Sequence, residues 1–346
     1  MRPALIAKFA AAVSTTNSPP ADEIPYTELT PDRILDAVES LGYRCNGRLL
    51  ALNSYENRVY QVGVEDGAPV VGKFYRPGRW SDAAILEEHD FAFELVEREI
   101  PVVAPLVFDG ASLHRFGGFR FSLYPKRPGR TPELGDPDIL RWLGRFIGRI
   151  HAVGATRRFR HRPRIDLESF GEQSAAFLLA GDFVPVDLRP AYESVVRDVL
   201  LKVRACYEAV GPVASIRLHG DCHPGNILWT DEGPHFVDLD DCATGPAIQD
   251  LWMLIAGDRQ TMTSQLSAIA EGYNEFHTLA TAEVGLVEAL RSLRMLHYSA
   301  WLGRRWADPA FPINFPWFGT QRYWQEQILG LREQLAAMDE PPLPLS

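Results

Sequence analysis

Residues 218–250 read LHGDCHPGNILWTDEGPHFVDLDDCATGPAIQD, and this stretch carries the strongest evidence for the fold. Two short apolar runs, 227–229 and 235–237, lie on either side of Asp231-Glu232-Gly233, a composition typical of a turn. Both runs have the length of short strands. We therefore expect an antiparallel β-hairpin centred on Glu232.

Three oxygen-bearing side chains surround the open end of this hairpin. Asn226 and Asp238 lie six residues to each side of Glu232, so they should face one another across the strands. Amide and carboxylate oxygens bind Mg²⁺ while phosphates and waters complete its octahedron. Asp221, five residues before Asn226, could accept the proton of a hydroxyl that attacks the γ-phosphate of ATP. The sequence thus predicts Asn226 and Asp238 as metal ligands and Asp221 as the catalytic base.

The spacing of these residues matches a known pattern. The distances from His219 to Asp221 and on to Asn226 are those of the protein-kinase catalytic loop, and 238–240 stands in the place of Asp-Phe-Gly. The glycine after His219, and the lack of one in the second triplet, resemble the aminoglycoside-phosphotransferase-like branch instead. We therefore expect an α+β, bilobal, protein-kinase-like fold, with an antiparallel N-terminal sheet, one packed helix and a mainly helical C-terminal lobe.

Two residues at the edges of this stretch are candidates for structural support of the catalytic loop. We expect His219 to be structural rather than an acid or base. Asp250 opens the apolar run IQDLWML. It either hydrogen-bonds the catalytic loop, as an Asp there often does in kinase-like folds, or is a plain helix N-cap.

Lys73 and Glu88 form the second predicted part of the site. The strand-like runs 57–64 and 69–75, with an Asp-Gly turn between them, predict a hairpin that carries Lys73. The helical pattern of 81–97 places Glu88 fifteen residues after Lys73, with Glu87 as the neighbouring candidate. A kinase fixes its phosphate-binding lysine with such a glutamate.

The turn before the first of these strands, residues 52–58, lacks the glycines of a kinase phosphate loop. Small polar side chains can still present backbone N–H groups and a hydroxyl to phosphates. We therefore assign Ser54 and Asn57, with Lys73, to nucleotide contact; an ordinary polar turn is the competing interpretation.

The remaining pattern suggests how the chain is divided. A helix should begin at Thr30 with Pro31 in its first position, further strands are expected at 102–108 and 119–124, and an amphipathic helix should start at 136. The expected organisation is a weakly ordered extension (1–25), an N-terminal nucleotide-binding lobe (26–124), a linker (125–135) and a C-terminal catalytic and substrate lobe (136–346).

Length and composition agree with this division. A chain of 346 residues exceeds the roughly 250–300 residues that one core usually supports, which favours two lobes. The net charge of −10 argues against nucleic-acid binding, which needs an excess of Lys and Arg. The four cysteines show no CxxC pair, and no apolar run approaches the roughly 18 residues of a membrane helix. We expect a cytoplasmic monomer.

Two segments remain open to more than one interpretation. The basic run 157–164 (RRFRHRPR) is either a solvated loop or a docking surface for an acidic substrate. The aromatic and proline-rich run 301–317 (WLGRRWADPAFPINFPW) is either packing or a wall on the acceptor side of the cleft.

Over about residues 30–345, the chain resembles the stress response kinase A family, bacterial serine/threonine protein kinases of the aminoglycoside-phosphotransferase-like superfamily. Departures are the N-terminal extension and variable sequence over 156–213. The segments that carry the resemblance are NSYENRVYQ (53–61), KFYRPGRW (73–80), ILEEH (85–89), LHGDCHPGNILW (218–229), FVDLDD (236–241), QDLWML (249–254) and WADPAFPINFPW (306–317).

This resemblance implies a function and leaves alternatives. It implies a cytoplasmic, ATP- and Mg²⁺-dependent kinase that phosphorylates protein Ser or Thr, with possible autophosphorylation and a role in stress survival. It also carries over Asp221 as proton acceptor and Asn226 and Asp238 as Mg²⁺ ligands. Small-molecule kinases for aminoglycosides, choline or homoserine share these catalytic parts, so such an acceptor stays open. A nucleotide-binding pseudokinase is the third alternative.

Overall fold

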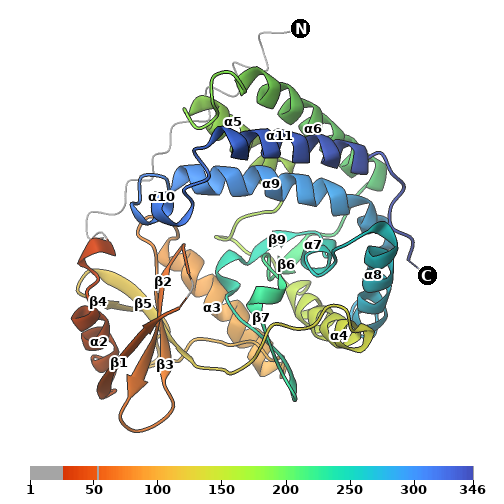
Figure 1. Cartoon of the computed structure of the whole chain (residues 1–346). Helices are drawn as coiled ribbons and strands as arrows, with labels where there is room; N and C mark the ends of the chain where they lie inside the picture. Colours follow the sequence, from red (N-terminus) through yellow and green to blue (C-terminus); the bar gives the residue numbers. More distant parts are fainter. Residues whose placement is uncertain (1–25, 53, 346) are drawn as a thin grey trace.

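The computed structural model describes residues 26–52 and 54–345 (Figure 1). The extension expected at 1–25 lies outside these residues. An antiparallel five-stranded sheet in the N-terminal part, with strand order β1-β2-β3-β5-β4, is followed by a largely helical part. The α+β kinase-like fold is therefore confirmed. The strands of the sheet are β1 (Cys45–Ala51), β2 (Arg58–Val64), β3 (Val70–Phe74), β4 (His114–Phe116) and β5 (Phe119–Pro125).

Helix α2 (Pro31–Glu39) covers part of the N-terminal sheet. Thr30 caps it by accepting a hydrogen bond from the backbone N–H of Arg33, and proline occupies its first turn, as predicted. Its buried side chains, Ile34 and Val38 among them, join one apolar cluster with β2, β3 and β5. A short 3-10 helix, η1 (Tyr26–Glu28), precedes it.

Helix α3 (Asp82–Glu97) connects the sheet to the rest of the molecule. Ser81 caps it as predicted, by accepting from the backbone N–H of Ala84. Its apolar residues Phe91 and Leu95 belong to the large C-terminal core, whereas the cluster under the sheet is separate. Helix α3 therefore packs on the C-terminal core, while His89 hydrogen-bonds Tyr75 and Ser112 of the N-terminal part.

Two predictions in the N-terminal part need correction. Residues 102–108 form no strand of the sheet; Val102 makes only an isolated bridge with Phe236. Conversely, β1 was not predicted, because CNGRLLA is interrupted by Asn46, Gly47 and Arg48 and is largely exposed at the sheet edge. An edge strand that is exposed on both faces lacks the alternation of apolar and polar residues by which strands are predicted.

The C-terminal part is built of helices around two small strand pairs. Strand β6 (Ile216–Leu218) pairs with β9 (Ala243–Gly245), and β7 (Ile227–Thr230) pairs with β8 (Gly233–Phe236). The helices are α4 (Pro137–Gly154), η2 (Leu167–Glu172), α5 (Gln173–Ala180), α6 (Arg189–Val210), η3 (Pro224–Asn226), η4 (Leu239–Asp241), α7 (Ile248–Trp252), α8 (Arg259–Tyr273), η5 (Thr281–Leu286), α9 (Val287–Arg304), α10 (Ala310–Asn314) and α11 (Gln321–Ala337).

Residues 126–136, between β5 and α4, contain neither helix nor strand element, and one isolated bridge joins Arg130 to Trp229 of β7. The exact lobe boundaries stay a prediction. Long helices α6, α9 and α11 lie together at one side of the molecule, and α10 lies next to the N-terminal sheet (Figure 1). Across 26–52 and 54–345, no helix is both long and apolar enough to cross a membrane.

Candidate active site

Lys73 lies on β3, opposite Val59 of β2, and its side chain is buried among carboxylates. Its Nζ is 3.1 Å from Oδ1 of Asp238, 3.2 Å from Oδ1 of Asp240 and 3.5 Å from Oε1 of Glu88. Burial alone would lower the pKa of Lys73, but these carboxylates outweigh burial and hold the pKa well above its usual value. A charged ammonium group therefore stands between the sheet, α3 and the segment after β8.

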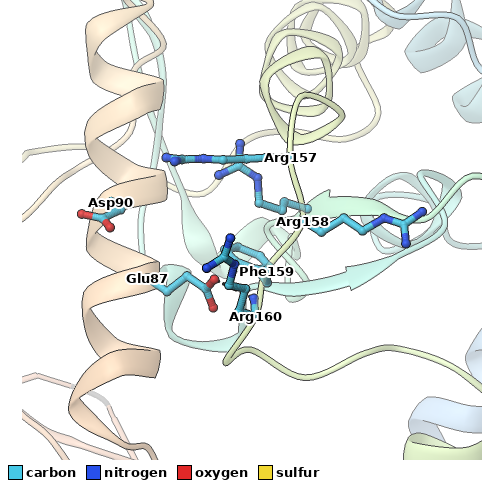
Figure 2. Close-up of a pocket in the computed structure, with 7 residues that line it drawn as sticks. Glu87, Asp90, Arg157, Arg158, Phe159 and Arg160 are labelled. Atoms are coloured by element: carbon cyan, nitrogen blue, oxygen red, sulfur yellow. Dashed lines mark hydrogen bonds between the residues drawn. The ribbon is translucent and has the colours of Figure 1, made fainter.

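The two neighbouring glutamates of α3 have different partners. Glu88 is buried and faces Lys73, and burial raises its pKa despite that lysine. Glu87 accepts backbone hydrogen bonds from residues 160, 161 and 162 at 2.6, 2.7 and 3.2 Å. Figure 2 shows Glu87 directed from α3 toward the loop that carries Arg160. Of the two candidates, Glu88 is thus the one at Lys73, and Glu87 holds the loop after α4.

The basic run 157–164 has two kinds of arginine. Arg157, Arg158 and Arg160 are exposed and line, with residues of α3 and β6, a pocket of about 500 Å³ (Figure 2). Arg162 is buried instead: its guanidinium donates to the backbone oxygens of residues 240 and 242 and lies over the ring of Trp80. Part of the run is therefore structural, and a docking role for the exposed part stays a prediction.

Asp240 and Arg79 belong to the site although the sequence analysis did not select them. Asp240 is buried and pairs with both Lys73 and Arg79, and Arg79 also pairs with Asp241. Burial alone would raise the pKa of Asp240, but Arg79 and Lys73 hold it well below its usual range. Both residues lie in motifs that the sequence does show: Asp240 ends the triplet that begins at Asp238, and Arg79 lies in KFYRPGRW.

Asp221 lies in the loop between β6 and β7 with a partner at each oxygen. Its Oδ1 is 2.8 Å from a guanidinium nitrogen of Arg294 of α9, and its Oδ2 is 3.5 Å from Nε2 of His223. Nδ2 of Asn226 donates to the backbone oxygen of Asp221 at 2.9 Å and lies 3.5 Å from Oδ2. Asp221 and Asn226 are therefore held together, and Arg294 is a neighbour that local sequence patterns could not reveal.

The β7–β8 hairpin forms as predicted, but its register differs by one residue. Its tip consists of residues 231–232, and the N–H of Val237 donates to the backbone oxygen of Asn226 at 3.0 Å. Asn226 therefore faces Val237, and Asp238 comes one residue later. The prediction that Asn226 and Asp238 are direct cross-strand partners was wrong, because the turn is not centred on Glu232.

Asp238 and Asn226 nevertheless fit a divalent cation. Asp238 has a left-handed backbone (φ 59°), which is uncommon outside glycine, and its side chain is about half exposed. Asn226 uses Nδ2 toward Asp221, which leaves Oδ1 for a ligand. In the part of the chain that the structure describes, no three His, Cys, Asp or Glu side chains gather as a metal site. An ion here would take its other ligands from phosphate oxygens and water, as Mg²⁺ commonly does.

Asp250 lies inside α7 and holds the loop that precedes Asp221. Its carboxylate accepts from the backbone N–H of His219 at 2.8 Å and of Gly220 at 2.9 Å. His151 contacts the same carboxylate at 2.9 Å, and Nε2 of His219 is 2.9 Å from the backbone oxygen of Val237. All three side chains are buried. The N-cap interpretation of Asp250 is wrong, because the helix begins before it.

Residues 55–57, in the loop between β1 and β2, are tied to other elements by their side chains. Asn57 is 2% exposed, and its Oδ1 accepts from the backbone N–H of Arg76 at 3.0 Å. This oxygen therefore has a structural partner, so the predicted nucleotide contact of Asn57 loses support. Ser54 is half-buried, and its nucleotide contact stays a prediction.

The aromatic run 301–317 meets this same loop. Nε1 of Trp301 donates to Glu56 at 2.6 Å, and Arg305 pairs with the same carboxylate. The rings of Tyr55 and Phe315 contact edge to face with centroids 4.8 Å apart. The run therefore packs α9 and α10 against the predicted nucleotide loop. The other interpretation of its composition, a wall on the acceptor side of the cleft, stays a prediction.

Comparison with known proteins agrees with the fold and with the kinase assignment. Residues 48–284 match the phosphotransferase enzyme family. Stress response kinase A of Escherichia coli (strain K12) is 46% identical over 321 residues, which is 93% of this chain and 97% of that protein. A protein of Salmonella typhimurium named serine/threonine protein kinase RdoA is 45% identical over the same shares.

Solved structures with the same fold are more distant in sequence. The amicoumacin kinase hAmiN, in complex with AMP-PNP and Ca²⁺, has a TM-score of 0.70 at 18% identity and covers 93% of this chain and 98% of its own. A microcompartment-associated aminopropanol kinase has a TM-score of 0.68 at 16% identity and covers 90% and 99%. From the family match and the near full-length identity, the chain is a kinase that belongs to the phosphotransferase enzyme family and, within it, to the stress response kinase A family.

Proposed function

We propose that this kinase transfers the γ-phosphoryl group of ATP to a serine or threonine hydroxyl of a protein. The observation that most supports phosphoryl transfer is the meeting of Lys73 with Glu88 and Asp238, together with the Asp221–Asn226 pair. Phosphoryl transfer needs little covalent chemistry from the protein and depends on positioning and charge stabilisation. These residues are suited to both tasks.

Each residue has a role that follows from its surroundings. Lys73, whose charge is secured by its carboxylate neighbours, binds the nucleotide phosphates, and Glu88 keeps its side chain in place. Asp221 accepts the proton of the acceptor hydroxyl. Asp250 holds the backbone of His219 and Gly220, just before Asp221, and the ring of His219 links this loop to the backbone oxygen of Val237.

A bound Mg²⁺ would neutralise charge that develops on the transferring phosphoryl group. Asn226 and Asp238 supply the oxygens that would hold it, and the complex of hAmiN with AMP-PNP and Ca²⁺ supports a nucleotide with a divalent cation. The hydrogen bond from Asn226 to the backbone of Asp221 keeps the metal-binding and proton-accepting positions adjacent.

The protein acceptor is supported by relatives rather than by the catalytic parts. The relatives at 45–46% identity over nearly the whole chain are named stress response kinase A and serine/threonine protein kinase. The amicoumacin and aminopropanol kinases that share the fold are 18% and 16% identical. The proposal includes a role in stress response, action as a monomer in the cytoplasm, and autophosphorylation, which labelling of the protein incubated alone tests.

Radiolabelling with γ-labelled ATP and Mg²⁺ tests the proposal. The purified protein is incubated alone, with dephosphorylated casein as an acidic protein and with histone as a basic one. We expect label on protein with the wild type and its loss, by about 10²-fold or more, in Asp221→Asn, with ATP binding retained.

Asp231→Asn is the matched control, because Asp231 lies exposed at the tip of the β7–β8 hairpin. This variant should label protein like the wild type. Full activity in Asp221→Asn would contradict the role of Asp221. ATP binding without label on any protein would contradict the protein acceptor and favour a small-molecule one.

A further inference from the structure

Arg294 of α9 places a positive charge directly at the proposed catalytic base. One of its guanidinium nitrogens is 2.8 Å from Oδ1 of Asp221, and the side chain is 37% exposed. A guanidinium has five N–H donors in a planar fork, so one contact with Asp221 leaves others free to bind. A hydroxyl that approaches Asp221 must therefore arrive beside Arg294.

Arg294 begins a continuous wall along one face of α9. Residues 294, 298 and 301 follow helical spacing and so lie on one face of α9, and Arg305 comes directly after the helix. Tyr298 is 40% exposed and stacks on Trp301, with centroids 5.7 Å apart and an angle of 15° between the planes. The wall ends where Trp301 and Arg305 contact Glu56 of the nucleotide loop. The wall thus runs from the proposed base to the loop expected to cover ATP.

The carboxylates along this wall are already paired with arginines. Glu56 contacts Arg305, Arg76 at 3.0 Å and Arg79 at 3.6 Å. Asp308, just beyond α9, pairs with Arg76 at 2.8 Å. A cationic acceptor would have to displace one of these guanidinium groups to gain either of these two carboxylates.

The largest ring of the wall is already in contact with a cation. An ammonium group can bind to an aromatic face without any carboxylate. The ring of Trp301, however, already has the guanidinium of Arg305 at 5.2 Å from its centroid and Tyr298 stacked on it. The exposed guanidinium of Arg294 remains as the group on this wall that can pair with a charge on the acceptor.

We propose that Arg294 is a specificity residue that selects an acceptor with an anionic group beside the hydroxyl to be phosphorylated. This inference rests on the proposed function and extends it to the substrate class: a serine or threonine next to acidic residues. In the free enzyme Arg294 orients Asp221, and in the complex its remaining N–H donors bind the carboxylate of the acceptor.

Two synthetic peptides test this selectivity. Each contains a single serine, flanked by aspartates in one peptide and by lysines in the other. We expect the wild type to prefer the aspartate peptide by about tenfold in kcat/KM, the effect of one favourable charge pair. In Arg294→Gln, KM for the aspartate peptide should rise about tenfold while KM for ATP is unchanged, which removes the preference.

Further variants separate charge from folding. Arg294→Lys keeps the charge and should retain most of the preference, whereas Arg294→Glu should favour the lysine peptide. Arg322→Gln removes an exposed arginine from α11 and should match the wild type. A wild-type preference for the lysine peptide would overturn the inference, and so would an unchanged preference in Arg294→Gln and Arg294→Glu. If Arg294→Gln lowered kcat equally on both peptides and left KM unchanged, Arg294 would only orient Asp221, and the inference would be wrong.

A small-molecule arm distinguishes failure of this inference from failure of the proposed function. If the wild type labels neither peptide, the protein acceptor is wrong, and glycerate and ethanolamine are compared as an anionic and a cationic hydroxyl compound. Faster phosphorylation of glycerate, lost in Arg294→Gln, supports the inference. Faster phosphorylation of ethanolamine, or of neither compound, overturns it.

Discussion

The carboxylate of Asp240 lies 3.2 Å from the ammonium group of Lys73, closer than the carboxylate of Glu88, which the sequence selected as the partner of this lysine. Asp240 is buried and pairs also with Arg79, so it links the sheet, the segment before α3 and the segment after β8. The site is therefore a network of several charges rather than a single Lys–Glu pair.

Removing the charge of Asp240 should destabilise the protein. Asp240→Asn leaves the buried guanidinium of Arg79 without its main partner, and breaking one side of a buried pair costs about 3 kcal/mol or more. Asp241→Asn is the control, since Asp241 pairs with the same arginine but is 53% exposed and should change stability by no more than about 1 kcal/mol. Urea unfolding measures both, and equal losses in the two variants would contradict the buried network.

A methyl group at Gly220 should disrupt the loop before Asp221. Gly220 has φ +83°, and a Cβ there would lie 2.2 Å from the backbone oxygen of Asp241. Gly211→Ala is the matched control, because Gly211 has φ +77° but nothing within 4 Å of a Cβ. The positive φ alone costs about 1–3 kcal/mol in each variant, and the close approach adds to that cost in Gly220→Ala, so thermal unfolding should show a larger loss there. Similar losses would show that the close approach to Asp241 is unimportant.

Asp250→Asn should impair both stability and turnover. Both carboxylate oxygens of Asp250 accept backbone N–H groups of His219 and Gly220, and an amide would turn its own donors toward one of them. Leaving such a buried donor unpaired costs about 1–3 kcal/mol. The expected result is a fall in kcat of about tenfold or more, with KM for ATP little changed.

The control for that variant is Asp258→Asn. Asp258 caps α8 by accepting from the backbone N–H of Thr261, and Asn is an equally good cap. Steady-state kinetics and thermal unfolding of the two variants can be compared directly. If Asp250→Asn turned over ATP at the wild-type rate, Asp250 would not be needed to position the loop.

Stability should fall as the pH drops below about 6.5, in part because of His297. Burial lowers the pKa of His297 to about 3, and the ring stacks on Phe170 with centroids 3.9 Å apart. Between these two values the unfolded chain binds a proton that the folded protein does not, so stability rises with pH across the window. One such histidine contributes a slope of about 1.4 kcal/mol per pH unit.

His297→Phe should therefore make the acid side of the stability profile shallower by about that slope. The measurement is the free energy of unfolding in urea at several pH values between about 3.5 and 7. His161→Phe serves as the control, because His161 is exposed. Parallel profiles for the wild type and His297→Phe would mean that His297 is not held neutral by burial.

The sequence predicted best where one local pattern decides the structure. The caps at Thr30 and Ser81 and the β2–β3 hairpin around Lys73 formed as expected, because each depends on residues close together in the chain. The β7–β8 hairpin was also found, but its register was not, since a turn of two rather than three residues changes which side chains face each other. Edge strand β1 was not predicted, because its largely exposed residues show no alternation of polar and apolar side chains.

Local sequence patterns were enough to predict the kinase-like fold, the family and the candidates Lys73, Asp221, Asn226 and Asp238. Which charges meet, Arg294 with Asp221 and Arg305 with Glu56, could be seen only in the folded chain. Arg294 lies in α9 and Arg305 directly follows it, whereas Asp221 and Glu56 lie in loops far from them in the chain. Their contact depends on how α9 packs across the molecule, which local periodicity does not encode, so the acceptor side of the site became visible only in three dimensions.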